Sequence, residues 1–239
     1  MTSVIHRYLL DGQAVKASVT RDYRNQLREQ WQIRYAASER QKHSRIYLGK
    51  PMELLVAQDL EHAGVSIVDL EATGGPCDIV ALRNEENLFV EVKFIGTDDA
   101  TFLAIENSFS TGGVTVGFGD PYSASDYLLS RLFEAAKQLE KVNGRRLAVV
   151  VIDDYVSWPS FQFGLKHNFI DWESPVLFAQ DERTRKHLNK LRTKHPHLDE
   201  EISRLSEMVN DIRIYRLLEE YKLEVKFERT DSGTSMHKT

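Results

Sequence analysis

The chain has 239 residues, 41% of them hydrophobic, which is enough for one large domain, or a domain with appendages, and for a substantial core. Its single cysteine, Cys77, excludes an intrachain disulfide and favours a reducing compartment, and the formal net charge is only −5. The sequence has no signal-peptide pattern and no apolar run of membrane-spanning length, so we expect a cytoplasmic protein with no membrane partner.

The first 50 residues are basic, although the chain as a whole is acidic. They hold ten Lys/Arg and four Asp/Glu, a net charge of +6, so the remainder carries −11. We expect residues 1–47 to form a basic, largely helical arm, in which aromatic and leucine side chains recur every fourth position from Tyr23 to Tyr35. Packing against the domain or a second subunit is the simpler interpretation of this stripe, and nucleic-acid contact is the alternative. The candidate nucleic-acid-binding residues here are Arg21, Arg24, Arg28 and Arg34.

The next segment predicts a helix followed by a strand. Pro51 suits the first turn of a helix, and Gly64 is a typical stop after an apolar face. Glu53 lies at the border of that face, where a carboxylate that satisfies early backbone N–H groups is the simpler interpretation. Residues 65–70 then favour a strand that leads into a Gly-Gly turn.

Residues 74–94 predict a β-hairpin with a polar turn over 84–87. The expected pairing places Asp78 opposite Lys93 and Val80 opposite Glu91, so that Asp78, Glu91 and Lys93 share one face. Both faces are otherwise apolar, which is typical of a strand pair in the middle of a covered sheet. Buried charges are costly unless they are paired or bind a metal ion.

Two carboxylates and a lysine on one face suit metal-assisted chemistry at a phosphate. Asp78 and Glu91 can hold Mg²⁺, which prefers oxygen ligands, and the ion polarises a phosphate and lowers the pKa of a bound water. Lys93 can orient that water or stabilise the charge that develops. A surface hairpin with an Asp–Lys cross-strand pair is the structural alternative. Cys77 is expected to be a small buried residue that points to the face opposite Asp78.

Beyond the hairpin, residues 96–125 are rich in Gly, Ser and Thr and lack a phosphate-binding motif, so we expect a substrate loop or a lid. A helix is predicted over 126–143, with Arg131 and Gln138 flanking its buried stripe, and a fully buried strand over 145–153.

The C-terminal third predicts further packing elements. The aromatic residues of 155–180 favour core packing, 182–194 a basic helix with a solvated face, and 198–221 an amphipathic helix. Residues 223–227 predict a last strand, and 230–239 a disordered tail.

The order of these elements, with Asp78 and Glu91-Val92-Lys93 on the hairpin, resembles the PD-(D/E)XK nuclease superfamily over residues 48–153. Glu53 matches the acidic residue that many members carry on the preceding helix, and Gln138 the polar residue that several branches carry on the following helix. The sequence departs from the pattern in that Pro76 is separated from the aspartate by Cys77.

The resemblance implies an α/β restriction-endonuclease-like core over 48–153, with a mixed four-to-five-stranded sheet flanked by helices and a C-terminal extension over 154–229 packed on it. It implies that Asp78, Glu91, Glu53 and the Val92 carbonyl bind Mg²⁺, for which Mn²⁺ can substitute. It also implies that Lys93 positions the attacking water, and that Gln138 orients Lys93 or touches the phosphate backbone.

The function that the resemblance implies is Mg²⁺-dependent endonucleolytic cleavage of DNA, in phage defence, restriction or repair. Arg131 joins the N-terminal arginines as a candidate nucleic-acid contact. An RNA-cleaving nuclease, and a non-catalytic nucleic-acid-binding or assembly subunit with the same fold, stay open as alternatives. A homodimer and a separate targeting subunit are the protein partners to be tested.

Overall fold

The structure is a computed structural model, and it describes residues 21–27, 29, 49–70, 77–96, 121–153, 189–190, 192–218, 222–230 and 233–236. The predicted substrate loop or lid lies largely outside these ranges, as do the aromatic segment 155–180, Arg28 and Arg34.

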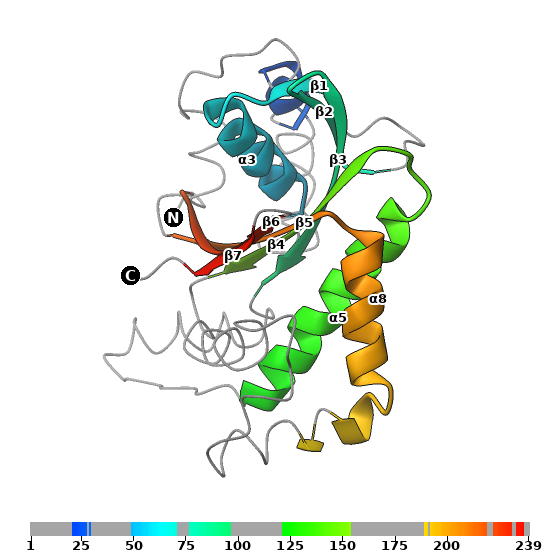
Figure 1. The fold of residues 1–239 in the computed structure, drawn as a ribbon. Helices are drawn as coiled ribbons and strands as arrows, with labels where there is room; N and C mark the ends of the chain where they lie inside the picture. Colours follow the sequence, from blue (N-terminus) through cyan, green and yellow to red (C-terminus); the bar gives the residue numbers. More distant parts are fainter. Residues whose placement is uncertain are drawn as a thin grey trace, which may run out of the picture.

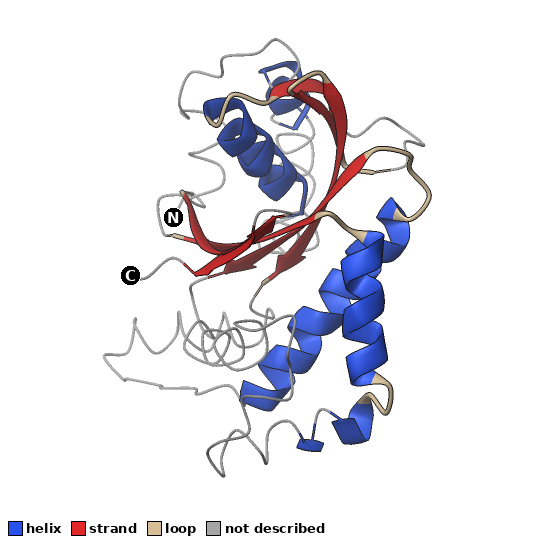
Figure 2. Ribbon diagram, in the orientation of Figure 1, coloured by secondary structure: helices blue, strands red, loops and turns tan. Residues whose placement is uncertain are grey.

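One sheet of seven strands runs through the molecule, in the order β1-β2-β3-β4-β5-β6-β7. Its strands are red in Figure 2. The three central strands, β3, β4 and β5, are parallel, and the other neighbours pair antiparallel, so the sheet is mixed. The strand bounds are Ser66–Leu70 for β1, Ile79–Arg83 for β2, Glu86–Ile95 for β3, Arg145–Asp153 for β4, Asp211–Leu217 for β5, Leu223–Thr230 for β6 and Gly233–Met236 for β7.

Helices cover both faces of the sheet (Figure 1). Helix α3 (Gly49–His62) packs on one face, and helices α5 (Pro121–Leu139) and α8 (Leu198–Met208) lie together on the other. Residues 21–27 are also helical, and Tyr23 and Leu27 are buried on the α3 side. The predicted packing of these two members of the N-terminal stripe is therefore confirmed. No helix in the described part of the chain is long and apolar enough to cross a membrane.

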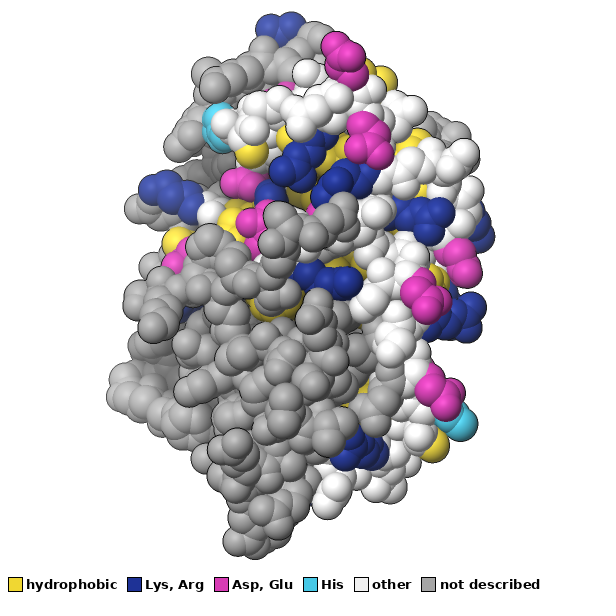
Figure 3. All heavy atoms as spheres, in the orientation of Figure 1, with side chains coloured by type: hydrophobic (Ala, Val, Ile, Leu, Met, Phe, Trp, Pro, Cys, Tyr) yellow, Lys and Arg dark blue, Asp and Glu magenta, His cyan; other side chains and the backbone are white. Residues whose placement is uncertain are grey.

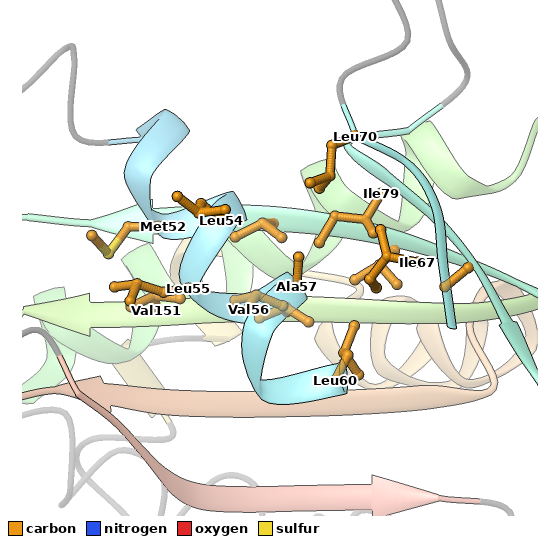
Figure 4. Close-up of a cluster of buried hydrophobic side chains, with 14 of the residues drawn as sticks. Met52, Leu54, Leu55, Val56, Ala57, Leu60, Ile67, Leu70, Ile79 and Val151 are labelled. Carbon is orange, nitrogen blue, oxygen red and sulfur yellow. The ribbon is translucent and has the colours of Figure 1, made fainter. Parts of the chain in front are cut away.

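The alternation of side chains along the strands creates two separate hydrophobic clusters. On the α3 side, Val149 and Val151 of β4 meet the apolar residues of the helix, several of which are labelled in Figure 4. On the α5 side, Ala148, Val150 and Ile152 meet α5 and α8. A strand that is apolar on both faces must be covered on both, which is why β4 sits at the centre of the sheet.

The C-terminal region differs most from the prediction. The helix expected over 198–221 ends at Met208, and β5 follows in its place, because Ile212 and Ile214 alternate into the α5-side cluster as strand residues do. The sheet consequently has seven strands where four to five were expected, and it continues past residue 153 into the predicted C-terminal extension. The expected disordered tail is wrong for residues 233–236, which form β7 by pairing with β6.

Candidate active site

The β2–β3 hairpin closes through a turn of two residues. Arg83 pairs with Glu86, and the residues between them, Asn84 and Glu85, have φ angles of 51° and 67°. Positive φ at both central positions matches the right-handed twist of the flanking strands, and asparagine tolerates this region well. A loop of two or of four residues was expected, with Asn84 paired with Asn87 or Arg83 with Leu88. The turn has two residues, and it lies one position earlier than expected, with Arg83 paired with Glu86.

This tight turn shifts the strand register. Val80 lies opposite Phe89, not opposite Glu91 as predicted, and continuing the same register brings Asp78 level with Glu91, not Lys93. Because the error is two positions, and side chains alternate with a period of two, the residues keep their faces. The predicted sharing of one face by the charged residues therefore survives the wrong register.

The charged face of β3 is the one that α5 covers. Val90 and Val92 point into the α3-side cluster. Glu91 is in register with Ala148 of β4, and Ala148 belongs to the α5-side cluster. Lys93 follows two positions later, so both side chains lie beneath α5, in the C-terminal half of a parallel strand. In open sheets of this kind, the carboxyl ends of parallel strands are where ligands bind.

Lys93 connects the strand to the helix above it. Its Nζ donates a hydrogen bond to Glu91 Oε1 at 2.6 Å and another to Gln138 Oε1 on α5. The predicted proximity of Gln138 to Lys93 is present in the structure. Two acceptors fix the ammonium group in position, and the lysine side chain retains a 19% exposed fraction.

Glu91 is the most deeply buried acid of the group, with a 1% exposed fraction. One carboxylate oxygen accepts the bond from Lys93, whereas the other, Oε2, is buried and has no hydrogen-bond partner. Burial, together with the neighbouring charge of Asp78, raises the pKa of Glu91 to about 7, and Lys93 only partly opposes this rise. A buried carboxylate with an unpartnered oxygen is costly, and either a proton or a bound cation relieves that cost.

Asp78 is held at the entrance of β2 by the neighbouring strand. Its Oδ2 accepts a hydrogen bond from the backbone N–H of Val92 at 2.8 Å. This bond ties the carboxylate to the segment Glu91–Lys93, close enough for its charge to act on Glu91. The structure thus brings Asp78, Glu91, Lys93 and Gln138 together, as the sequence predicted.

The position of Glu53 differs from the predicted one. Helix α3 begins at Gly49, so Glu53 lies beyond the first turn, and it is buried with a 5% exposed fraction where a position at the border of the core was expected. The hydroxyl of Tyr23 donates a hydrogen bond to Glu53 Oε2 at 2.7 Å. Among the described residues, no group of three or more His, Cys, Asp or Glu side chains is arranged to hold a metal ion, so Glu53 is not drawn into one cluster with Asp78 and Glu91.

Cys77 lies on the α5 side of the sheet, and the prediction that it points away from the charged residues is wrong. Residues 77 and 78 form a bend before β2 begins, so strand alternation does not apply to them. Cys77 is buried among the α5-side residues, and its Sγ donates to the carbonyl oxygen of Ile79 at 3.2 Å. Burial raises the pKa of the thiol to about 11, in keeping with the expected role as a small buried residue.

The candidate arginines lie in two places. Arg21 and Arg24 belong to the helical segment that packs on the α3 side through Tyr23 and Leu27, whereas the charged face of β3 is covered by α5. Arg131 lies on α5 itself, where it bonds Tyr127 and Glu134. Sequence reasoning missed Tyr23 as a partner of Glu53 and did not single out Tyr127, although its spacing of four residues from Arg131 was visible.

Comparisons with known proteins leave the family open. No protein-family model and no curated protein matches the chain. Among solved structures, the chain is similar to SfsA of Pyrococcus furiosus in complex with Ca²⁺, with a TM-score of 0.28 and 12% sequence identity. The match covers 76% of this chain and 62% of the other. A likeness at this level carries no argument about function.

Proposed function

We propose that the chain is a divalent-metal-dependent nuclease that hydrolyses phosphodiester bonds, with DNA as its preferred substrate. The observation that carries this proposal is the Glu91 carboxylate, which is buried, bonded to Lys93 through one oxygen and orphaned at the other, beside Asp78. Hard divalent cations prefer oxygen ligands, and Mg²⁺ usually binds proteins through one or two carboxylates while keeping several waters. The pair of acids fits that requirement.

The order of elements around the site supports a restriction-endonuclease-like core. A helix, three antiparallel-paired strands, a second helix and a parallel strand follow one another from α3 to β4. The hairpin carries Asp78 and Glu91-Val92-Lys93 at its open end, and α5 carries Gln138 above them.

In the proposed mechanism, Asp78, Glu91 and the Val92 carbonyl would hold Mg²⁺, with Mn²⁺ able to substitute. When bound, the ion supplies Lewis acidity toward the phosphate and the attacking water. Lys93 places an ammonium group beside the carboxylates, where it orients the water or stabilises the charge that develops on the phosphate. Gln138 holds Lys93 through its amide oxygen. Glu53, which the resemblance also assigns to the metal, shares its carboxylate with Tyr23.

Cleavage assays test the proposal directly. Plasmid, single-stranded DNA and RNA are incubated with the protein and Mg²⁺ or Mn²⁺. Asp78→Asn and Lys93→Ala should each lower the rate by about 100-fold or more, because the first removes a proposed metal ligand and the second removes the ammonium group that stabilises the reacting phosphate. The matched control is Glu85→Gln, at the exposed turn of the same hairpin, which should leave the rate unchanged. Absence of cleavage on all substrates, or full activity in Lys93→Ala, would sink the proposal.

Metal binding gives a readout that is independent of turnover. Titration calorimetry of the wild type with Mn²⁺ should show binding that Asp78→Asn removes, whereas Glu85→Gln should bind as the wild type does. Affinity should fall below about pH 7, because the proton that Glu91 takes up competes with the cation. Identical titrations for Asp78→Asn and the wild type would contradict the assignment of Asp78.

A non-catalytic nucleic-acid-binding or assembly subunit is the second candidate. The bond of Glu53 to Tyr23, away from the other two acids, favours it, because a site with only two carboxylates binds metal less strongly. This candidate predicts salt-sensitive binding to nucleic acid without metal-dependent turnover. RNA cleavage, with DNA left intact, would instead support the RNA-cleaving alternative.

A targeting subunit or a second copy of the chain belongs to the same proposal. On the face seen in Figure 3, the described Lys and Arg side chains are interspersed with Asp and Glu. Charges of mixed sign on this part of the surface supply little of the general attraction that a basic face gives to a phosphate backbone, and we propose that a partner chain adds affinity. Light scattering, with and without oligonucleotide, would show whether the chain dimerises.

A further inference from the structure

One side of α5 forms a continuous polar stripe that ends at the candidate active site. Tyr127, Arg131, Glu134 and Gln138 follow one another at intervals of four, three and four residues, so they share one side of the helix. Gln138 bonds Lys93 of the candidate site. Eleven residues separate Tyr127 from Gln138, which corresponds to about 16 Å along the helix axis.

Tyr127 is exposed, and its ring and its hydroxyl both contact Arg131. Its exposed fraction is 42%, and it is the aromatic member of the three large exposed hydrophobic residues in the described part of the chain. Arg131 Nη2 donates to the Tyr127 hydroxyl at 2.8 Å, and the guanidinium carbon lies 4.9 Å from the ring centroid. Arg131 Nη1 is in turn bound to Glu134 at 2.6 Å.

We propose that Tyr127 is the surface on which an unpaired base stacks when a single-stranded nucleic-acid segment runs from the candidate active site along α5, with Arg131 as the residue that positions the ring. The proposal rests on the proposed function to the extent that nucleic acid lies over Lys93. Proteins commonly bind single strands by stacking bases on aromatic side chains. Every base has a flat π-face that can stack in this way.

The ion pair between Arg131 and Glu134 favours a role for Arg131 in positioning Tyr127 over a direct contact with phosphate. Because Glu134 neutralises the guanidinium, the pair offers little net attraction to a phosphate backbone. Bases in a duplex are stacked on one another, so their faces are covered, and only an unpaired nucleotide can present one to Tyr127. The stripe therefore fits a single strand better than a duplex. An ordinary surface helix with an i,i+4 pair is the structural alternative, and the following measurement separates the two.

Binding is measured by fluorescence anisotropy, with the full chain carrying Asp78→Asn so that the probe is not cut. The probes are a labelled oligodeoxythymidine and a labelled blunt duplex. Adding Tyr127→Ala should weaken binding of the single strand by about 5- to 100-fold, the range that loss of one stacked base gives, and should change duplex binding little. Tyr127→Phe should retain most of the affinity, because its ring still stacks. The slope of affinity against salt should be unchanged, because stacking releases no counterions.

The matched control is Lys137→Ala, which removes an exposed cation next to Gln138 from a different side of α5. Circular dichroism must show the same helix content for all variants. Equal affinities of Tyr127→Ala and its parent for the single strand would overturn the inference, as would an equal loss for the duplex. For Arg131, a double-mutant cycle is informative. Arg131→Ala should weaken single-strand binding, and this effect should vanish when Tyr127 is already alanine.

The two proposals fail separately. Binding of the single strand that depends on Tyr127, without any metal-dependent cleavage, would overturn the proposed nuclease and keep the stacking role. Cleavage that depends on Lys93, with no sensitivity of single-strand binding to Tyr127, would overturn the stacking role and keep the nuclease.

Discussion

At the scale of single residues, the candidate site is defined by the conflict between charge and burial. Glu91 and Cys77 both lie beneath α5, and burial raises the pKa of each side chain, so the folded protein favours the protonated form of both. The charge of Asp78 acts on both side chains, but only Glu91 is a carboxylate that accepts a hydrogen bond from a lysine, Lys93. The same burial therefore makes the cysteine inert and makes the glutamate a candidate for metal binding.

Glu91 should make the stability of the metal-free protein depend on pH. Its pKa in the folded state, about 7, lies above the ordinary value of 4.5, so between these values the folded state binds more protons than the unfolded state. The free energy of unfolding should consequently fall as the pH rises from about 5 to 8, by about 1 to 3 kcal/mol. Urea titrations of the wild type in EDTA at several pH values would measure it.

The variant Glu91→Gln should remove this dependence and be more stable than the wild type at pH 8, while the exposed control Glu85→Gln should follow the wild type. Saturating Mn²⁺ should restore stability to the wild type at pH 8 but not to Glu91→Gln. If the stability of the wild type in EDTA did not change between about pH 5 and 8, the raised pKa of Glu91 would be contradicted.

Cys77 should be protected from thiol reagents in the native protein. With a pKa near 11 and an 8% exposed fraction, its thiol carries little negative charge at pH 8 and is poorly accessible. Labelling with iodoacetamide, followed by mass spectrometry, should be slow in buffer and at least about 100-fold faster in denaturant, where the thiol regains its ordinary pKa. Rapid labelling of the native protein would show that the segment around Cys77 opens readily.

At the scale of elements, turns and glycines decide how the hairpin and its neighbours fit together. The tight turn at Asn84 and Glu85 fixes the register that brings Asp78 level with Glu91. Gly144, which precedes β4, lies directly against the end of the hairpin: a Cβ there would meet Phe89 Cε2 at 2.8 Å and the carbonyl oxygen of Asn87 at 3.1 Å. The close approach of β4 to β3 therefore requires a residue without a Cβ atom at position 144.

Substituting alanine for two glycines should separate the stability lost through a steric clash from the stability lost through an unfavourable φ angle. Gly144→Ala should destabilise the protein by about 2 to 4 kcal/mol, because it adds both a backbone penalty and a clash. Gly64→Ala, with a φ of 86° but open space around the Cβ position, should cost about 1 kcal/mol. Thermal unfolding of the two variants checks the order, and equal losses would show that the contact with Phe89 relaxes freely.

The turn offers the opposite test, a stabilising change. Glu85→Gly should stabilise the hairpin by about 0.5 to 1 kcal/mol, since glycine adopts a φ of 67° without strain. Glu86→Gly, one position later in β3, should destabilise by a similar amount, because glycine in a strand loses more conformational freedom. Denaturant midpoints of the two variants moving in the same direction would contradict the turn described for Asn84 and Glu85.

At the scale of the whole molecule, β5 and β6 belong to the same folded unit as the candidate site. The Tyr215 hydroxyl on β5 donates to Asp59 Oδ2 of α3 at 2.5 Å, and Arg213 bonds the Tyr215 hydroxyl, Asp59 and Glu228 of β6. This network ties the helix that carries Glu53 to strands from beyond residue 153. A core of 48–153, as the resemblance implies, would lack these partners.

A fragment spanning 48–153 should therefore not fold by itself. It would expose β4, whose residues 147–152 are buried on both faces, as the edge of the sheet, and it would leave Asp59 without Tyr215 and Arg213. Circular dichroism and amide-proton NMR dispersion should show a cooperative fold for the full chain and not for the fragment. A folded fragment with a sharp unfolding transition would show that the strands after residue 153 are an appendage.

The sequence by itself determined the elements near the site and the sides of the hairpin. Strand β4 coincides with its predicted range of 145–153, because a continuous apolar run between a glycine and an aspartate leaves little choice. The shared face of Glu91 and Lys93 follows from the period of two along a strand, and a register error of two positions cannot change it.

Only the tertiary structure decided which residues meet across the chain. Glu53 pairs with Tyr23, thirty positions earlier, and periodicity within one element contains no information about such a distance. The proximity of Gln138 to Lys93 was expected from the resemblance alone, for the same reason. The same holds for residues 211–217, where helix and strand patterns are both compatible with the apolar spacing. The place available beside β4, between two hydrophobic layers, decides for the strand.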